Sequence, residues 1–192
     1  MRSRLALIPL LAFAALLTAL GSVAQAKPLI GLADQNGATL QDSRYKALKI
    51  KNLRTTISYD QIRKGGSRLA SQDFFLNTAN AEKKSILVTF YRTASAKPSV
   101  AAKRLPTVSE FQKDFERFRI RYPFVKKFST WNEENFPKAQ PTGRNPKRTA
   151  QFYLMLRKEC KKRTLSVDGK SANVAPCTVL TGDFRANGSS FD

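Results

Sequence analysis

Residues 124–135 read Phe-Val-Lys-Lys-Phe-Ser-Thr-Trp-Asn-Glu-Glu-Asn. A run of β-branched and aromatic residues ends abruptly in polar side chains that can form hydrogen bonds, Asn132 to Asn135. In a barrel of parallel strands, the carboxyl end of a strand is where reactive groups are placed. A carboxyl group there, beside an indole and an amide, can protonate an oxygen atom and hold a hydroxyl group. The stretch therefore predicts a strand whose carboxyl end carries a functional site.

The segments on both sides of this stretch alternate between strand and helix patterns. Apolar or alternating runs predict four further strands, at 28–34, 53–60, 85–91 and 174–183. Helical patterns lie between the strands, at 42–49, 67–84, 107–122 and 145–159. Because strands and helices alternate, the sequence predicts an α/β fold with about five parallel strands and crossover helices.

The clearest helix begins at Thr107, with Glu110 three residues later as in a capping box. Its apolar residues recur at helical spacing and form one stripe: Val108, Phe111, Phe115, Phe118 and Tyr122. Such a stripe is typical of packing against a core, and we expect it to be core rather than a ligand groove. The next helix has Asn145 as its cap and Pro146 at its first position.

Acidic residues terminate four of the five predicted strands. They are Asp34, Asp60, Glu133 with Glu134, and Asp183, which is more than chance predicts for a chain with 14 acidic residues. The carboxyl ends of parallel strands share one rim, so these groups are expected to lie close together. In the second strand, Arg54 points to the opposite side from Leu53. Asp34, Asp60 and Asp183 are expected to be rim or capping residues rather than catalysts.

The N-terminus has the pattern of an export signal. Arg2 and Arg4 precede an apolar run, and Ala24-Gln25-Ala26 is a small-x-small cleavage site. The alternative is an N-terminal membrane anchor, but the run is marginal for spanning a bilayer. We expect residues 1–26 to be a signal peptide cleaved after Ala26. The mature chain is then secreted, forms one domain over 27–184 and ends in a disordered tail over 185–192, with no stable membrane span.

The composition excludes several kinds of chemistry. There is no histidine, which excludes Ser-His and Cys-His nucleophiles and His-ligated metal sites within this chain. No metal-ligand cluster or Gly-rich phosphate loop is present, so no metal and no cofactor are expected. The formal net charge is +20, but the Lys and Arg residues are spread along the chain and are densest at 157–163. An exported basic protein is expected to meet anionic polymers, and the alternative is a solvated cationic surface without a partner. Nucleic acid is not an expected partner.

Cys160 and Cys177 are the only two cysteines. In an exported protein, a pair of cysteines indicates a disulfide, and closing this loop would contribute about 3 kcal/mol in the chain-entropy model. The alternative is two unpaired, buried thiols.

Several of these stretches resemble a known family. Thr130-Trp131-Asn132-Glu133-Glu134-Asn135 is similar to the Trp-Asn-Glu-x-Asn motif that ends the fourth strand in clan A of the glycoside hydrolases. Three further stretches resemble an exported bacterial branch of glycosyl hydrolases: 105–111 (Leu-Pro-Thr-Val-Ser-Glu-Phe), 118–123 (Phe-Arg-Ile-Arg-Tyr-Pro) and 145–150 (Asn-Pro-Lys-Arg-Thr-Ala). The resemblance covers roughly residues 28–184.

The resemblance implies a (β/α)8 TIM barrel that cleaves glycosidic bonds with retention, using two carboxyl groups about 5 Å apart. Glu133 matches the general acid/base, and Asn132 matches the residue that holds the 2-hydroxyl of a carbohydrate substrate. Arg54 is similar to the arginine that supports the nucleophile, although a structural ion pair with Asp60 or Glu133 is an equal alternative. Trp131 is expected to buttress Glu133. The candidate substrate-binding residues are therefore Asn132, Arg54, Trp131, Asp34 and Asp183.

The sequence departs from the family in one respect. The nucleophile of the family is a glutamate that ends the seventh strand, whereas the pattern here has five strands. We therefore expect an incomplete barrel, truncated relative to the family, with little glycosidase activity alone and an open sheet edge through which it self-associates. The alternative function is a non-catalytic secreted binder of anionic cell-wall polymers or glycans.

Overall fold

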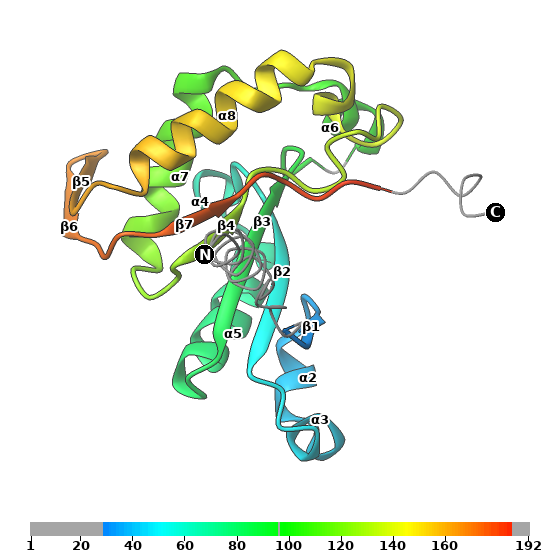
Figure 1. Ribbon diagram of the computed structural model, residues 1–192, viewed down its shortest axis with the longest axis vertical. Helices are drawn as coiled ribbons and strands as arrows, with labels where there is room; N and C mark the ends of the chain where they lie inside the picture. The colour runs from blue at the N-terminus through cyan, green and yellow to red at the C-terminus, as the bar shows by residue number, and fades with distance from the viewer. Residues whose placement is uncertain (1–28, 96, 186–192) are drawn as a thin grey trace, which may run out of the picture.

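One parallel sheet organises the protein, as the computed structural model shows for residues 29–95 and 97–185 (Figure 1). Its strand order is β1-β2-β3-β4-β7, and every neighbouring pair is parallel. The strands are β1 (Gly31–Ala33), β2 (Asn52–Ser58), β3 (Ser85–Tyr91), β4 (Lys127–Ser129) and β7 (Thr178–Leu180). The predicted α/β fold with five parallel strands is confirmed. In the part that the structure describes, the sheet does not close into a barrel, and β1 and β7 form its edges.

Helices connect successive strands, as the parallel arrangement requires. The helices are α2 (Gly37–Gln41), α3 (Ser43–Ala47), α4 (Gln61–Lys64), α5 (Ser67–Ala81), α6 (Pro98–Lys103), α7 (Val108–Arg121), the 3-10 helix η1 (Pro141–Arg144) and α8 (Pro146–Glu159). The side chains of Thr107 and Asn145 accept hydrogen bonds from the N–H of Glu110 and Arg148, both at 3.0 Å. Both predicted N-caps are therefore confirmed.

The core lies between α7, α8 and the sheet. Phe111 of α7 contacts Phe90 of β3, Trp131 and Phe152 of α8, with ring centroids 4.9–5.6 Å apart and edge-to-face geometry. The stripe of α7 is buried or partly buried along its whole length, so the prediction that it packs in the core is confirmed. Strand alternation directs Leu53 and Ile57 of β2 into the same core.

The region between α8 and β7 differs from the prediction. Residues 164–173 form an antiparallel hairpin of β5 (Thr164–Val167) and β6 (Lys170–Asn173), which the sequence analysis did not identify. Asp168 and Gly169 connect the two strands and both have positive φ, 51° and 73°. An Asp-Gly pair is a strong signal for a two-residue hairpin turn. The predicted strand at 174–183 is correspondingly shorter, and β7 begins at Thr178.

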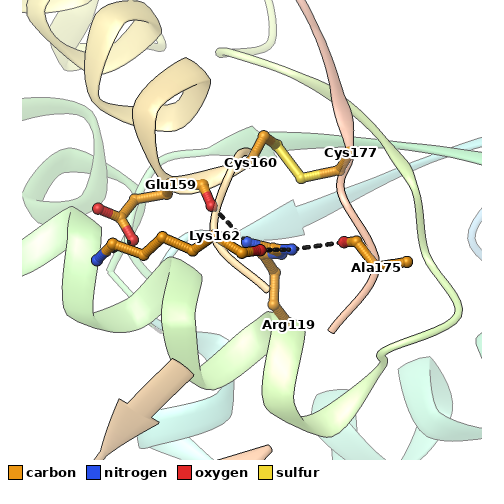
Figure 2. The surroundings of a disulfide bond; sticks show 6 residues. All are labelled: Arg119, Glu159, Cys160, Lys162, Ala175 and Cys177. Atoms are coloured by element: carbon orange, nitrogen blue, oxygen red, sulfur yellow. Dashed lines mark hydrogen bonds and ion pairs between the residues drawn. A yellow bond between two sulfur atoms is a disulfide. The ribbon is translucent and has the colours of Figure 1, made fainter. Parts of the chain in front are cut away.

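A disulfide joins the end of α8 to the segment that leads into β7 (Figure 2). Cys160 and Cys177 are bonded, with Cα atoms 4.7 Å apart, and this pairing confirms the prediction. Beside it, the buried guanidinium of Arg119 donates hydrogen bonds to the carbonyl oxygens of Glu159 (2.6 Å) and Ala175 (2.7 Å). Arg119 therefore ties α7 to both chain segments that the disulfide links.

Two predictions concern residues outside the described part of the chain. The signal peptide at 1–26 lies there, as does the tail beyond Arg185. Among the helices of the described residues, none is long and apolar enough to cross a membrane.

Candidate functional site at the carboxyl ends of the strands

Three side chains meet, one from within β2 and two from the segments that follow β4 and β7. Arg54 lies on β2, Asn132 follows β4 and Asp183 follows β7. The Nη2 atom of Arg54 donates a hydrogen bond to Oδ1 of Asn132 at 2.8 Å, and Arg54 also forms an ion pair with Asp183. These residues are far apart in the sequence, so their contact depends on the parallel order of the strands.

Backbone hydrogen bonds beyond the strands hold this rim in place. The N–H of Asn132 donates to the carbonyl of Phe90 at 2.7 Å, and the N–H of Asp183 donates to the carbonyl of Trp131 at 3.1 Å. Asn135 and Arg185 add a reciprocal pair, because the side chain of Asn135 donates to the carbonyl of Arg185 and accepts from its N–H. The loops after β4 and β7 therefore continue the pairing of the two strands.

Glu133 lies next to this group in the chain. Its backbone has a φ of 46°, in the left-handed region that is uncommon for residues other than glycine. Its carbonyl accepts a hydrogen bond from the N–H of Phe136 at 2.9 Å, which closes a turn, and its side chain is partly exposed. Glu133 is therefore partly accessible in the turn after β4, and its catalytic role stays a prediction.

Trp131 does not form part of an exposed surface. Its side chain is 0% exposed and packs against Tyr59 and Phe152, and its Nε1 donates to Oε1 of Gln140 at 3.1 Å. The assignment of Trp131 as a substrate-contacting residue therefore does not fit the structure, because burial removes the indole from any ligand. Its position in the core supports the backbone that carries Asn132 and Glu133.

The carboxylate of Asp34 is hydrogen-bonded within its own loop. It accepts hydrogen bonds from the N–H groups of Gln35 (2.6 Å) and Asn36 (3.0 Å). Burial acts to raise the pKa of Asp34, but hydrogen bonds from Thr39, Asn36 and Gln35 bring it below its ordinary value. Asp34 nevertheless shares a cavity of about 230 Å³ with Arg54, so both predicted residues face the same space.

Asp60 is fully buried and holds two strand ends together. Its carboxylate accepts a hydrogen bond from the hydroxyl of Thr93 and one from the N–H of Ala94 at 2.7 Å. It does not pair with Arg54, whose carboxylate partner is Asp183. The alternative in which Arg54 forms an ion pair with Asp60 is therefore wrong.

Glu134 is the residue whose environment the sequence did not reveal. It is only 8% exposed, its N–H donates to the carbonyl of Asp183 at 3.1 Å, and its Oε2 atom has no hydrogen-bond partner in the described part of the protein. Burial raises the pKa of Glu134 to about 7, and the negative charge of Asp183 contributes in the same direction. The one residue in the sequence that hints at this burial is Gly182, because the absence of a side chain there leaves room for the carboxyl group of Glu134. The hint can be used only once the pairing of β4 with β7 is known.

A polar cavity of about 450 Å³ adjoins the rim at the ends of β2 and β3. Its lining combines hydroxyl and amide side chains with two arginines, including Thr56, Ser58, Gln61, Arg68 and Arg92. Such groups suit a ligand with many hydroxyl groups. Among the described residues, no cluster of three or more His, Cys, Asp or Glu side chains is arranged to hold a metal ion.

Comparison with known proteins gives a similarity of fold. No protein-family model matches the sequence, and no curated protein sequence matches it. The structure is similar to that of a GH30 endoxylanase from Clostridium papyrosolvens C71, with a TM-score of 0.50 and 16% sequence identity. The similarity covers 83% of this chain and 43% of that enzyme, so the chain spans less than half of its length. The chain therefore has an α/β fold similar to that of a TIM-barrel glycoside hydrolase, with a sheet that is not closed.

Proposed function

We propose that this protein is an exported glycoside hydrolase-like protein in which Glu133 is the general acid/base. The observation that carries the proposal is the contact of Arg54 of β2 with Asn132 and Asp183, which follow the carboxyl ends of β4 and β7 beside Glu133. In barrel enzymes, that rim is where catalytic residues are located.

Asn132 has a defined role in this proposal. Because its Oδ1 accepts a hydrogen bond from Arg54, the amide is oriented with Nδ2 available as a donor. An amide held in this way can donate to the 2-hydroxyl of a sugar, a contact that strengthens in the transition state of glycoside hydrolysis. Glu133, the next residue, would then protonate the leaving oxygen.

The retaining mechanism requires a second carboxylate about 5 Å from the first. The described rim offers Asp34 and Asp183, but the first is bonded to its own loop and the second to Arg54. We therefore propose that the nucleophile is not among these residues and that the 192-residue polypeptide alone has little or no glycosidase activity. The export signal belongs to the proposal as well, and the disulfide suits an oxidising compartment.

The experiment measures both hydrolysis and binding by the purified polypeptide. Aryl glycosides and xylan, chosen because the similar structure is that of an endoxylanase, are the substrates. Turnover is expected to stay near background, and any turnover is expected to be lost in Glu133→Gln. Binding of xylo-oligosaccharides is expected to weaken about tenfold in Asn132→Ala, the loss expected for a good hydrogen bond, and to be unchanged in the exposed α5 control Asn80→Ala. Robust turnover that survives Glu133→Gln would refute the assignment.

A specific surface feature favours a second candidate function, the binding of anionic polymers. At the end of α8, the side chains of Arg157, Lys158, Lys161 and Arg163 are all exposed. Their charges lie within a short segment and are available to carboxylate or phosphate groups. Glu133→Gln separates the two candidates, because it abolishes hydrolysis under the first and leaves polymer binding intact under the second.

A further inference from the structure

A second cavity of about 450 Å³ lies away from the Arg54 cluster. It is formed by the loop after β4, the 3-10 helix η1, the first half of α8 and the segment after β7. The residues that line it are Glu134, Asn135, Thr142, Gly143, Pro146, Thr149, Ala150, Tyr153, Thr181 and Phe184. Its size corresponds to a ligand of one ring.

Two of these residues present buried polar atoms that lack a partner. Oε2 of Glu134 and Oγ1 of Thr142 form no hydrogen bond with any residue that the structure describes. Glu134 is 8% exposed and Thr142 is 1% exposed, so water reaches neither side chain freely. A buried carboxyl group without a partner is costly, and two such acceptors in one cavity indicate a missing donor.

The cavity also lacks positive charge. The chain contains 34 lysine and arginine residues, yet none of them lines this cavity. Four cations adjoin lining residues in the chain without lining the cavity themselves: Arg144, Lys147, Arg148 and Arg185. Two nearby arginines are stacked on aromatic rings, Arg157 over Tyr153 at 5.6 Å and Arg185 over Phe136 at 4.1 Å. Among the described residues, no side chain pairs with Oε2 of Glu134, so a bound ligand can supply the missing partner.

The walls are apolar and aromatic. Tyr153 on α8 and Phe184 after β7 line the cavity together with Pro146 and Ala150. Aromatic faces attract organic cations through their quadrupole, and an aromatic wall beside a carboxylate is the usual recognition site for an ammonium group.

We propose that this cavity binds an organic ammonium ion, whose N–H groups donate to Glu134 and Thr142 and whose carbon skeleton packs against Tyr153 and Phe184. The proposal does not depend on the glycosidase assignment, because it uses Glu134 and a cavity outside the Arg54 cluster. It explains why a carboxyl group is buried among apolar side chains in a strongly basic protein.

The position of the carboxyl group is set by Gly182. A methyl group added at Gly182 would lie 2.4 Å from Oε2 of Glu134, so the carboxyl group packs directly on this glycine. Gly182→Ala is therefore expected to displace the carboxyl group and to weaken binding without removing any charge.

The affinity is expected to depend on pH. Because burial raises the pKa of Glu134 to about 7, the free protein carries the carboxylate above that pH and the neutral acid below it. A cation binds the carboxylate form of Glu134 and not the neutral acid. The affinity of the protein for the cation is therefore expected to be about 30-fold higher at about pH 8 than at about pH 5.5, which is the ratio of the ionised fractions of Glu134 for this pKa.

Isothermal titration calorimetry on the full chain tests the proposal, with benzylamine as the cationic probe and benzyl alcohol as its neutral counterpart. Benzylamine is expected to bind at millimolar concentration and benzyl alcohol at least about tenfold more weakly. Glu134→Gln is expected to abolish the preference for the amine and its pH dependence, whereas the neighbouring carboxyl variant Glu133→Gln is expected to retain both.

Three results would overturn the proposal. They are equal affinity for the amine and the alcohol, amine binding that survives Glu134→Gln, and no benzylamine binding to the wild-type chain at about pH 8. Failure here is distinguishable from failure of the glycosidase assignment, because amine binding is read in Glu134→Gln and xylo-oligosaccharide binding is read in Asn132→Ala.

Discussion

Arg54 of β2 and Asp183, which follows β7, form an ion pair, although four strands, β3 to β6, lie between β2 and β7 in the chain. The same guanidinium holds the amide of Asn132 at 2.8 Å. One arginine of β2 therefore contacts the segments that follow β4 and β7. Its hydrogen bond to Asn132 orients the residue that precedes Glu133.

Replacement of Arg54 tests this connection. Arg54→Met is expected to lower the free energy of unfolding by about 1 kcal/mol, because both partners are partly exposed and solvent screens the pair. Urea denaturation measures the change. The control is Arg44→Met, because the Arg44 side chain is 91% exposed and its pair with Asp42 is expected to contribute close to nothing. Equal effects of the two substitutions would show that the Arg54 pair has no special role.

The disulfide is expected to contribute about 3 kcal/mol to stability by restricting the unfolded chain. Reduction of the wild-type chain is therefore expected to lower the urea midpoint, and the double variant Cys160→Ser with Cys177→Ser is expected to match the reduced protein. The double variant must not respond further to the reducing agent. An unchanged midpoint after complete reduction would contradict the entropic contribution.

The raised pKa of Glu134 predicts that the stability of the protein depends on pH. The folded protein holds the proton up to a pKa of about 7, whereas the unfolded carboxyl group releases it near its ordinary value of 4.5. The folded state binds more protons between these values, so stability falls as pH rises from about 4.5 to about 7. Glu134→Gln is expected to remove this fall and to be more stable than wild type by about 2 kcal/mol at about pH 8. Urea midpoints measured across this pH range test the prediction. If the midpoints of wild type and Glu134→Gln fall equally, the pH dependence belongs to other groups.

Because β7 is an edge strand of the sheet, we expect the chain to self-associate through it. Leu180 of the edge strand β7 is 48% exposed on the sheet face opposite the helices, and Leu154 of α8 is 62% exposed. Leu180→Lys is expected to shift analytical ultracentrifugation profiles toward the monomer, because a lysine on an edge strand opposes pairing. Leu154→Lys is the matched control and is expected to leave the profile unchanged. A wild-type chain that is monomeric at all concentrations would contradict the prediction.

The fold was predictable where the hydrophobic period was unambiguous. The stripe from Val108 to Tyr122 and the caps at Thr107 and Asn145 gave α7 and α8 their correct starts, and alternation placed Leu53 and Ile57 in the core. The hairpin of β5 and β6 was missed because its strands are short and polar. Its Asp168-Gly169 turn was the signal that was overlooked.

For the candidate site, the sequence predicted only that polar and charged residues gather where the parallel strands end. The sequence placed Asn132 and Asp183 at strand ends and Arg54 within the second strand, but it did not predict that Arg54 pairs with Asp183. It did not distinguish Glu134 from Glu133, because burial of one carboxyl group depends on Gly182 and the long-range pairing of two loops. Nor did it show that Trp131 is buried rather than exposed to a ligand.

The central claim is that Glu133 is the general acid/base and that Asn132, held by Arg54, binds the sugar beside it. A crystal structure of the full chain with a bound xylo-oligosaccharide tests it most directly. The account predicts a sugar 2-hydroxyl hydrogen-bonded to Nδ2 of Asn132 and the Glu133 carboxyl group within hydrogen-bond reach, about 3 Å, of a glycosidic oxygen. A Glu133 side chain directed away from Arg54 into solvent, with the saccharide bound elsewhere, would contradict it.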